Sequence, residues 1–444
     1  MLAMFSAAPL LQAQTYSVLH TFTGGNDGGH PGRLTMDRQG NLYGSSLLGG
    51  YDGAACQYGG SNGCGAVFEL KHSAHGWLFA PLYTFQGGAD GSRPGPVVFG
   101  PEGALYGTTM GGGSCQEFQY GCGTIFKLTP PPSFCTTALC PWVKTTLYTF
   151  AGGDDGWNYG WDDLGPVTFG ADGSMYGATR YGGYYDDGVV FKLAPSNGGW
   201  TESVIHTFHE DGYDGEWPSD GVVLDQAGNL YGVTWAGGAN YAGTIYELSP
   251  SGGGWTETTL HSFADGNNLE PEGGLIFDQA GNHYGTTTNT YNDRDGNVFK
   301  LTPYNGSWTY SVLYQFTDGL AGTGPKAPLT MDASGNIYGT AWDAPGGGSV
   351  FQLTPYNGGW METYLYEFTD GADGGYPVSN VLFDARGNLY GTASSYGSDN
   401  WGVLWEITRS TARKNPTHAD RQEGGIFIMQ QVTTGYVQRG HLPV

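Results

Sequence analysis

Short runs of alternating apolar and polar residues recur along the whole chain. Typical examples are AVFEL at 66–70, VVFKL at 189–193 and NVFKL at 297–301, in which the aromatic and the last aliphatic residue fall on one face. This period of two predicts β-strands. In six places a second run follows, which begins at a Trp and ends at a Phe eight residues later, as from Trp200 to Phe208. We therefore expect pairs of adjacent strands that repeat through the chain.

A Tyr-Gly motif precedes each of these pairs. The chain has seven copies, spaced by 52 to 70 residues, with their tyrosines at Tyr43, Tyr106, Tyr176, Tyr231, Tyr284, Tyr338 and Tyr390. Self-similarity at a period near 50 residues is typical of propellers and solenoids, in which one supersecondary unit is repeated.

Each unit divides into four strands. The unit at 220–263 begins with GVVLD, turns at QAGN, and continues with the LYGVT run before the two strands described above. An Asp-x-x-Gly-Asn sequence predicts the first hairpin turn, because Asp caps the turn and Gly supplies a positive φ. The Asp is replaced by Gly100 and Gly170 in the second and third units. Seven units of four antiparallel strands predict an all-β, seven-bladed β-propeller.

The ends of the repeat region indicate how the ring closes. Residues 15–22, TYSVLHTF, match a fourth strand without its Trp, and the repeat ends at 403–407, VLWEI, which is a third strand. We predict that these segments pair, so that the N-terminal strand completes the last blade. An open solenoid is the alternative, but it would leave two unpaired sheet edges.

The flanking segments lack the repeat. Residues 1–14 are apolar, like a secretory signal without its basic front, and 409–444 carry five of the 17 basic residues but no repeat motif. The predicted organisation is a signal remnant at 1–14, a propeller at 15–408 and a poorly ordered tail at 409–444.

The net charge and the hydropathy of the chain restrict the kinds of partner that it can bind. The formal net charge is −24, which argues against nucleic acid or an anionic membrane surface as a partner. No other apolar run approaches the length of a membrane span. We expect a monomer without a cofactor, whose partner is a glycan or a protein.

The cysteines form three close pairs in the first third of the chain. Local pairing favours small disulfide-closed loops and an oxidising compartment, whereas a zinc site would need CxxC spacing that no pair has. The predicted disulfides join Cys56 to Cys64, Cys115 to Cys122, and Cys135 to Cys140. We expect a secreted protein, extracellular or at the cell surface, with the periplasm as an alternative.

The repeat as a whole resembles a known family. LYGTT, the TIFKL-type third strand, a W-T-E-T-x-L-Y-x-F pattern and GG-x-DG-x-x-P connectors are similar to those of the GloVer tandem-repeat proteins, and the resemblance extends over about residues 15–408. It implies export and surface display, and no biochemical activity. No Pro-Glu-Pro sorting signal follows the repeat, so simple secretion is expected as much as anchoring.

Most histidines and acids in the repeat have a structural interpretation. His20, His206 and His261 alternate with Tyr at one position of the fourth strand, which predicts a packing position. Aspartates that recur in the connector to the next unit, usually as Asp-Gly, are predicted to form turns, although weak calcium binding is the alternative. These connector residues are Asp90, Asp155, Asp214, Asp265, Asp318 and Asp373.

The loops between second and third strands vary most from unit to unit. They carry aromatic residues beside short polar ones, a combination suited to stacking on a sugar and bonding its hydroxyls. The alternative is that the rings pack on neighbouring blades. The candidate ligand-binding residues are Tyr184, Tyr185, Asp186, Asp187, Trp235, Tyr241, Tyr291, Asp293, Trp342, Tyr396 and Trp401.

Two functions follow from these residues. The first is a non-enzymatic, exported binding or surface-interaction propeller with its ligand on the variable-loop face. The second is a carbohydrate-active enzyme, a glycosidase or lyase, in which Asp186 or Asp187 acts with Asp293. The first is preferred, because no candidate acid has a neighbour in the sequence that would tune its pKa.

Overall fold

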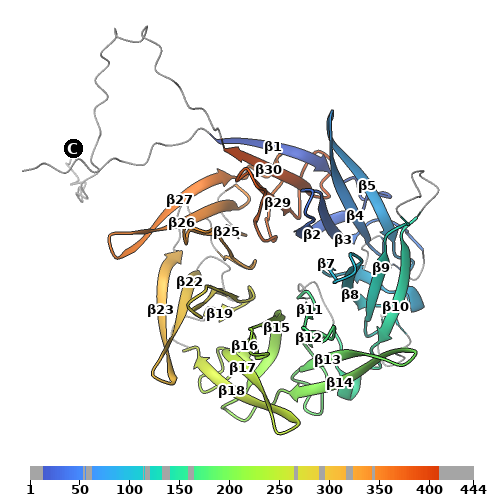
Figure 1. The fold of residues 1–444 in the computed structure, drawn as a ribbon. Helices are drawn as coiled ribbons and strands as arrows, with labels where there is room; N and C mark the ends of the chain where they lie inside the picture. Colours follow the sequence, from blue (N-terminus) through green and yellow to red (C-terminus); the bar gives the residue numbers. More distant parts are fainter. Residues whose placement is uncertain are drawn as a thin grey trace, which may run out of the picture. The chain divides into compact units, whose positions relative to one another are not determined.

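The chain folds into a ring of β-sheets. A computed structural model describes residues 14–53, 56, 63–113, 115, 121–132, 141–158, 165–264, 269–289, 296–316, 324–342 and 346–409. They belong to one compact unit that ends at Arg409. Its seven antiparallel sheets surround a central channel, which confirms the predicted seven-bladed propeller (Figure 1).

Each blade is numbered in chain order and described from the channel outward. Blade 1 contains β2 (Gly29–Met36), β3 (Leu42–Leu48), β4 (Ala66–Ser73) and β5 (Gly76–Thr84). Blade 2 contains β6 (Ser92–Pro94) with β7 (Val98–Phe99), then β8 (Leu105–Gly111), β9 (Thr124–Thr129) and β10 (Val143–Thr149). Blade 3 contains β11 (Thr168–Phe169), β12 (Met175–Thr179), β13 (Val189–Ser196) and β14 (Gly199–Thr207).

The remaining blades follow the same order. Blade 4 contains β15 (Gly215–Leu224), β16 (Leu230–Gly237), β17 (Thr244–Ser251) and β18 (Gly254–Ser262). Blade 5 contains β19 (Leu269–Pro271) with β20 (Ile276–Phe277), then β21 (His283–Asn289), β22 (Gly296–Tyr304) and β23 (Ser307–Phe316). Blade 6 contains β24 (Thr330–Met331), β25 (Ile337–Ala341), β26 (Ser349–Tyr356) and β27 (Gly359–Glu367). Blade 7 contains β28 (Leu382–Phe383), β29 (Leu389–Ala393), β30 (Val403–Arg409) and β1 (Gln14–Thr21). Short 3-10 turns at Gly88–Asp90 and Gly153–Asp155 form two of the connectors.

The N-terminal strand closes the ring as predicted. β1 pairs with β30 in an antiparallel register that runs from Gln14 opposite Arg409 to Thr21 opposite Val403 (Figure 1). Phe22, which follows β1, is fully buried, and its N–H donates to the carbonyl of Gly402 at 3.0 Å. The first and last segments of the propeller therefore share one sheet.

The Asp-x-x-Gly-Asn turns are held by their own side chains. In blade 1, Asp37 Oδ1 accepts the N–H of Asn41 at 2.9 Å, and Oδ2 accepts Asn41 Nδ2 at 2.7 Å and the hydroxyl of Tyr43 at 3.2 Å. The same set recurs at Asp225, Asp278, Asp332 and Asp384. The motif thus stabilises the hairpin between the first two strands of the blade.

The glycine of the Tyr-Gly motif is required by packing. A Cβ at Gly44 would lie 2.6 Å from Phe68 of the adjacent strand, and one at Gly391 would lie 2.3 Å from Trp405. No real side chain tolerates such distances, so glycine lets the aromatic of the third strand cover the second strand. The repeated motif is therefore scaffold and not a site.

The core lies between blades. Seven clusters of buried apolar residues each combine side chains from two neighbouring blades, one for every joint of the ring. The joint between blades 7 and 1 buries Phe22, Phe68 and Leu404 completely. Burial of apolar surface at all seven joints holds the blades around the channel.

Disulfides close two of the variable loops. Cys56 is bonded to Cys64 and Cys115 to Cys122, as predicted, and these bonds close the loops between second and third strands of blades 1 and 2. Cys135, Cys140 and the predicted signal and tail segments lie outside the described residues, except Gln14 and Arg409. In the part of the chain that is described, no helix has the length and apolarity to cross a membrane.

Candidate functional site

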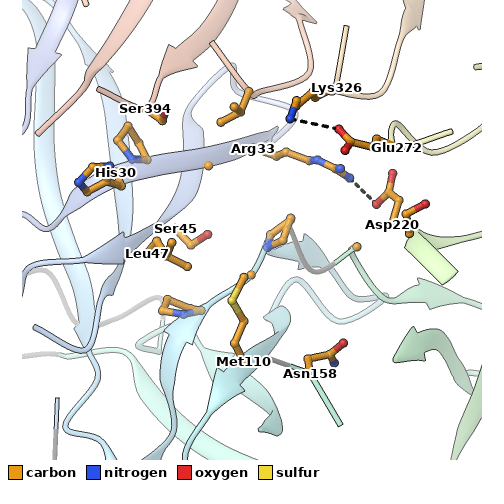
Figure 2. A pocket seen from close by; sticks show the side chains of 18 of the residues that line it. His30, Arg33, Ser45, Leu47, Met110, Asn158, Asp220, Glu272, Lys326 and Ser394 are labelled. Carbon is orange, nitrogen blue, oxygen red and sulfur yellow. Dashed lines mark hydrogen bonds and ion pairs between the residues drawn. The ribbon is translucent and has the colours of Figure 1, made fainter. Parts of the chain in front are cut away.

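A pocket of about 530 Å³ occupies the central channel, and every blade contributes to its wall. A volume between roughly 300 and 1,000 Å³ is typical of sites for small ligands. Figure 2 shows His30, Arg33, Met110 and Asp220 among the side chains that line it. The channel therefore offers a ligand a concave surface of suitable size.

In four blades, a non-glycine residue before the first proline adopts an unusual backbone conformation. His30, Arg93, Trp217 and Tyr376 each precede a proline, and their φ angles are 52°, 55°, 56° and 54°. The left-handed conformation costs a non-glycine residue roughly 1–3 kcal/mol, and such residues cluster at functional sites. Of the four, His30 and Tyr376 line the pocket.

A second set of pocket residues follows the Tyr-Gly motif. We call the third residue after the Tyr-Gly pair the rim position. In chain order, the rim position holds Leu47, Met110, Arg180, Trp235, Thr288, Trp342 and Ser394. Five of these seven line the pocket, whereas Trp235 and Thr288 do not. The strand that carries this position is nearly identical between blades, so the variation is concentrated where the strand meets the pocket.

Four charged groups of the pocket form two ion pairs (Figure 2). Arg33 Nη1 lies 2.6 Å from Asp220 Oδ1, and the two side chains are only 7% and 6% exposed. Lys326 Nζ lies 3.7 Å from Glu272 Oε2, and these side chains are 27% and 23% exposed. The first pair is buried and tight, whereas the second is looser and accessible to a ligand.

Aromatic rings gather at two sides of the channel. On blades 6 and 7, Trp342, Tyr376 and Tyr396 form a row with ring centroids 4.9 Å and 5.6 Å apart. The Lys326 ammonium lies 4.7 Å from the centroid of Trp342, within the range of a cation–π interaction.

The other aromatic group lies on blades 3 and 4. Trp217 and Trp235 have centroids 5.5 Å apart, and the guanidinium of Arg180 lies 5.3 Å from the Trp235 ring. Trp157 stacks on Tyr181 at 4.8 Å beside them. Arg180 of the pocket wall therefore contacts a tryptophan that does not line the pocket, whereas Lys326 contacts Trp342, which does.

Short polar side chains and one histidine complete the wall. Ser45, Asn158 and Ser394 bring hydroxyl and amide groups to the pocket. Burial lowers the pKa of His30, although a backbone hydrogen bond at Ser394 opposes this shift. Burial therefore favours the neutral form of the His30 imidazole.

The candidate ligand-binding residues that were predicted from the sequence lie in different parts of the structure. Trp342 lines the pocket, Tyr396 contacts Tyr376, and Trp235 stands against Arg180. Trp401 instead packs at the joint between blades 7 and 1, where a Cβ on Gly24 or Gly29 would lie 2.3 Å from its ring.

The predicted residues of the blade 3 loop have mostly local contacts. Asp186 accepts hydrogen bonds from the N–H of Gly182 at 2.9 Å and from Trp157 Nε1 at 3.3 Å. Asp187 accepts the N–H of Glu210 at 3.2 Å, and burial raises its pKa. Tyr185 stacks on His209 with centroids 3.8 Å apart. These contacts stabilise the loop, and none of the three residues lines the pocket.

The other predicted tyrosines lie at the surface or outside the described chain. Tyr184 is 80% exposed and Tyr241 is 62% exposed, and neither lines the pocket. Tyr291 and Asp293 lie outside the described residues, so the predicted pairing of Asp186 or Asp187 with Asp293 stays a prediction.

The connector aspartates that the structure describes have structural roles, whereas Asp265 and Asp318 lie outside the described residues. Asp90 accepts the hydroxyl of Tyr83 at 2.7 Å and the N–H of Gln86 at 2.9 Å, and Asp214 lies 3.0 Å from His206 Nε2. A phenol and an imidazole can both donate to this carboxylate, which explains why Tyr and His alternate at one repeat position. Within the described ranges, no three His, Cys, Asp or Glu side chains are grouped closely enough to hold a metal ion.

Sequence reasoning missed Arg33, Asp220, Glu272 and Lys326. Their common signal is a fixed offset from the first proline of the blade: Arg33 and Asp220 come two residues after it, and Glu272 and Lys326 one residue after it. Charged residues occur at these offsets only in some units, and that irregularity within a regular repeat indicates a site.

Fold and pocket together define the class: a seven-bladed β-propeller with a polar, aromatic-lined central pocket. The model of the Gloeobacter/Verrucomicrobia repeat matches residues 114–346, more than half of the chain. The protein therefore belongs to this repeat family, as the sequence motifs predicted. No similar sequence was found among curated proteins.

Solved structures are similar in fold only. A puromycin hydrolase matches with a TM-score of 0.50 and 12% identity, over 83% of this chain and 50% of that one. A putative 6-phosphogluconolactonase from Bacteroides uniformis matches with a TM-score of 0.48 and 14% identity, over 76% of this chain and 85% of that one. At 12% identity the match to the puromycin hydrolase supports the propeller fold alone and no activity.

Proposed function

We propose that this protein is an exported, non-enzymatic carbohydrate-binding propeller whose ligand occupies the central pocket. The observation that supports this most is the row formed by Trp342, Tyr376 and Tyr396, with ring centroids 4.9 Å and 5.6 Å apart, of which Trp342 and Tyr376 line the pocket. Sugars present an apolar C–H face that stacks on such rings, and this contact contributes much of the affinity for a saccharide.

Polar groups beside the rings supply the second requirement of a sugar site. Ser394 and Ser395 from blade 7, Ser45 from blade 1 and Asn158 from blade 3 line the same pocket. Hydroxyls and amides both donate and accept hydrogen bonds, as sugar hydroxyls do. A few such groups in an aromatic-lined cavity are typical of a small-ligand site.

Export is part of the proposal. The bonds Cys56–Cys64 and Cys115–Cys122 indicate an oxidising environment, because cytosolic thiols are kept reduced. An extracellular or cell-surface location would place the pocket in contact with glycans.

One observation favours a second candidate, a carbohydrate-active enzyme. Asp220 and Glu272 line the same pocket from neighbouring blades, and glycosidases use two carboxyl groups. Each of these carboxylates is paired with a cation, however, as expected of groups that shape a binding site. Release of reducing ends from a bound oligosaccharide, lost in both Asp220→Asn and Glu272→Gln, would favour the enzyme.

A glycan array with the purified propeller tests the binding proposal. We expect retention of a restricted set of saccharides by the wild type and a loss of about fivefold or more in affinity for Trp342→Ala, since stacking on a tryptophan contributes about 1 kcal/mol or more. Tyr184→Ala, at an exposed loop residue outside the pocket, is the matched control and should bind like the wild type. An array without any retained saccharide would contradict the proposal.

A further inference from the structure

One repeated position joins the outer strands of neighbouring blades. We call it the joint position; it lies six residues before the Phe that ends or follows each outer strand. Its side chain faces the outer strand and the connector of the preceding blade. In chain order the joint position holds Tyr16, Phe79, Lys144, Glu202, Glu257, Tyr310 and Glu362. The chemistry of each joint therefore depends on this residue.

Three of the joints contain a stack of two aromatic rings. The centroids are 3.7 Å apart for Tyr16 on Tyr366, 3.8 Å for Phe79 on His20 and 4.3 Å for Tyr310 on His261. In these joints the joint position brings no charge near neutral pH, because phenyl and phenol rings are uncharged there.

A cation occupies the joint position between blades 1 and 2. Lys144 Nζ lies 3.1 Å from Asp90 Oδ1 and donates to the Asp90 carbonyl at 2.6 Å. The hydroxyl of Tyr83 donates to the same carboxylate oxygen at 2.7 Å. The Lys144 side chain is only 5% exposed. The connector carboxylate is therefore balanced by an ammonium group and a phenol.

The joint between blades 2 and 3 has a carboxylate in place of this cation. Tyr148 donates its hydroxyl to Asp155 Oδ2 at 2.8 Å, as Tyr83 does to Asp90. Glu202 lies beside both groups, and burial, and next the Asp155 carboxylate, raise its pKa to about 7. Among the described residues, Asp155 Oδ1 and Glu202 Oε1 are buried without a hydrogen-bond partner.

One proton is missing from this arrangement. A phenol donates a single proton, so Tyr148 cannot satisfy two ionised carboxylates at once. The titratable groups that face Glu202 across the joint are Tyr148 on β10 and Asp155 on the turn Gly153–Asp155, and its pairing partner on β13 is Leu193. Two carboxylates that share a site hold one proton between them more readily than two separate ones.

The two other joints with a glutamate differ from this one. Beside Glu257, the His206 imidazole lies 3.0 Å from Asp214 and can itself take up a proton. Beside Glu362, the Tyr314 hydroxyl donates to the carboxylate, and the connector residue Asp318 lies outside the described residues.

We propose that the joint between blades 2 and 3 is a pH-sensitive switch, closed while Asp155 and Glu202 share one proton and open after that proton is released to solvent. In the closed state, one carboxyl group donates its O–H to the other carboxylate. After release, two adjacent negative charges repel each other and separate β14 from the turn Gly153–Asp155. The same segment continues to Asn158, which lines the pocket and accepts the N–H of Arg180 at 2.9 Å. Opening of the joint therefore alters the pocket wall.

Hydrogen exchange of the full chain, followed by mass spectrometry and corrected for the intrinsic pH dependence of exchange, tests the switch. Protection of β14 and of residues 151–158 should fall at least about tenfold between about pH 5 and about pH 7.5, because the open joint releases the proton of Glu202 near its ordinary pKa of 4.5 and the closed joint only near 7. β5, beside the Lys144 joint, is the internal reference and should stay protected. Equal protection of β14 at both pH values would overturn the proposal.

Two variants assign the switch to Glu202. Glu202→Gln supplies an amide that donates to Asp155 at every pH, and Glu202→Lys copies the pairing of Lys144 with Asp90. Both should keep β14 protected at the higher pH, whereas Glu367→Gln, at an exposed position of β27, should lose protection like the wild type. Thermal unfolding verifies that each variant is folded. If either folded Glu202 variant still loses protection tenfold, another group carries the pH dependence and the proposal is wrong.

Discussion

Arg33 and Asp220 meet across the central channel with 2.6 Å between Nη1 and Oδ1, although 187 residues separate them in the chain. Both stand two residues after the first proline of their blades, in blade 1 and blade 4. Equivalent positions of two repeats thus carry opposite charges that neutralise each other in the interior. The pair links blades that share no sheet.

Removing one partner of this pair should destabilise the fold. We expect Asp220→Asn to lower the free energy of unfolding by about 3–5 kcal/mol, because the buried guanidinium of Arg33 would lose its counter-charge. Asn is chosen because residue 220 has a φ of 62°, which Asn tolerates. Urea denaturation followed by tryptophan fluorescence measures the effect.

Two further variants control this prediction. Lys192→Met removes a more exposed pair, in which Lys192 and Asp172 are 27% and 53% exposed, and should cost less than about 1 kcal/mol. Arg33→Met combined with Asp220→Asn removes both charges and should recover part of the loss. If Asp220→Asn were no worse than Lys192→Met, the pair would not contribute as proposed.

Closure of the ring depends on Phe22. This side chain is fully buried and has edge contacts with Phe68 and Phe79, at centroid distances of 5.2 Å and 5.7 Å. Phe22→Asp should lower stability by at least about 3 kcal/mol, from the lost packing and the burial of a carboxylate. Val18→Asp is the matched control, because Val18 on the same strand is 37% exposed and should cost far less. Differential scanning calorimetry compares the two, and equal melting temperatures would contradict closure by β1.

Stability should depend on pH through Glu202. Burial, and next the nearby Asp155 carboxylate, raise the pKa of Glu202 to about 7 from its ordinary 4.5. Between these two values the folded protein binds a proton that the unfolded chain releases, so stability falls as pH rises from 4.5 to 7. The melting temperature of the wild type should therefore decrease over this interval. Glu202→Gln should remove part of the decrease, because burial also raises the pKa of Glu216 and Glu257 to about 7. Glu367→Gln, at an exposed position of β27, should leave the profile unchanged.

The disulfides should stabilise the protein. Each encloses a short loop, with sequence separations of 8 and 7, for which chain entropy predicts roughly 2 kcal/mol. Replacing both Cys115 and Cys122 by serine should lower the free energy of unfolding by about this amount. Non-reducing peptide mapping should recover Cys56 with Cys64, Cys115 with Cys122, and the sequence-predicted pair of Cys135 with Cys140. Free thiols at Cys56 or Cys64 in the native protein would contradict both the pairing and the oxidising compartment.

The sequence by itself determined the blade and the number of blades. The contacts that define a blade are local, as in the turn from Asp37 to Tyr43 and in the packing of Phe68 on Gly44, and each recurs at a fixed spacing. Closure of the ring could also be predicted from the sequence, because the chain begins with the strand type that its last unit lacks.

Only the tertiary structure decided which residues share the pocket. Both Trp401 and Trp342 were predicted from the sequence as loop aromatics that bind a ligand. In the structure, Trp401 packs against Gly24 and Gly29 between two blades, whereas Trp342 lines the channel. The pairing of Arg33 with Asp220 depends on the curvature that brings blades 1 and 4 to face each other. Local sequence specifies how a strand turns and which face it buries, but distances across the ring arise from the sum of all seven blade joints.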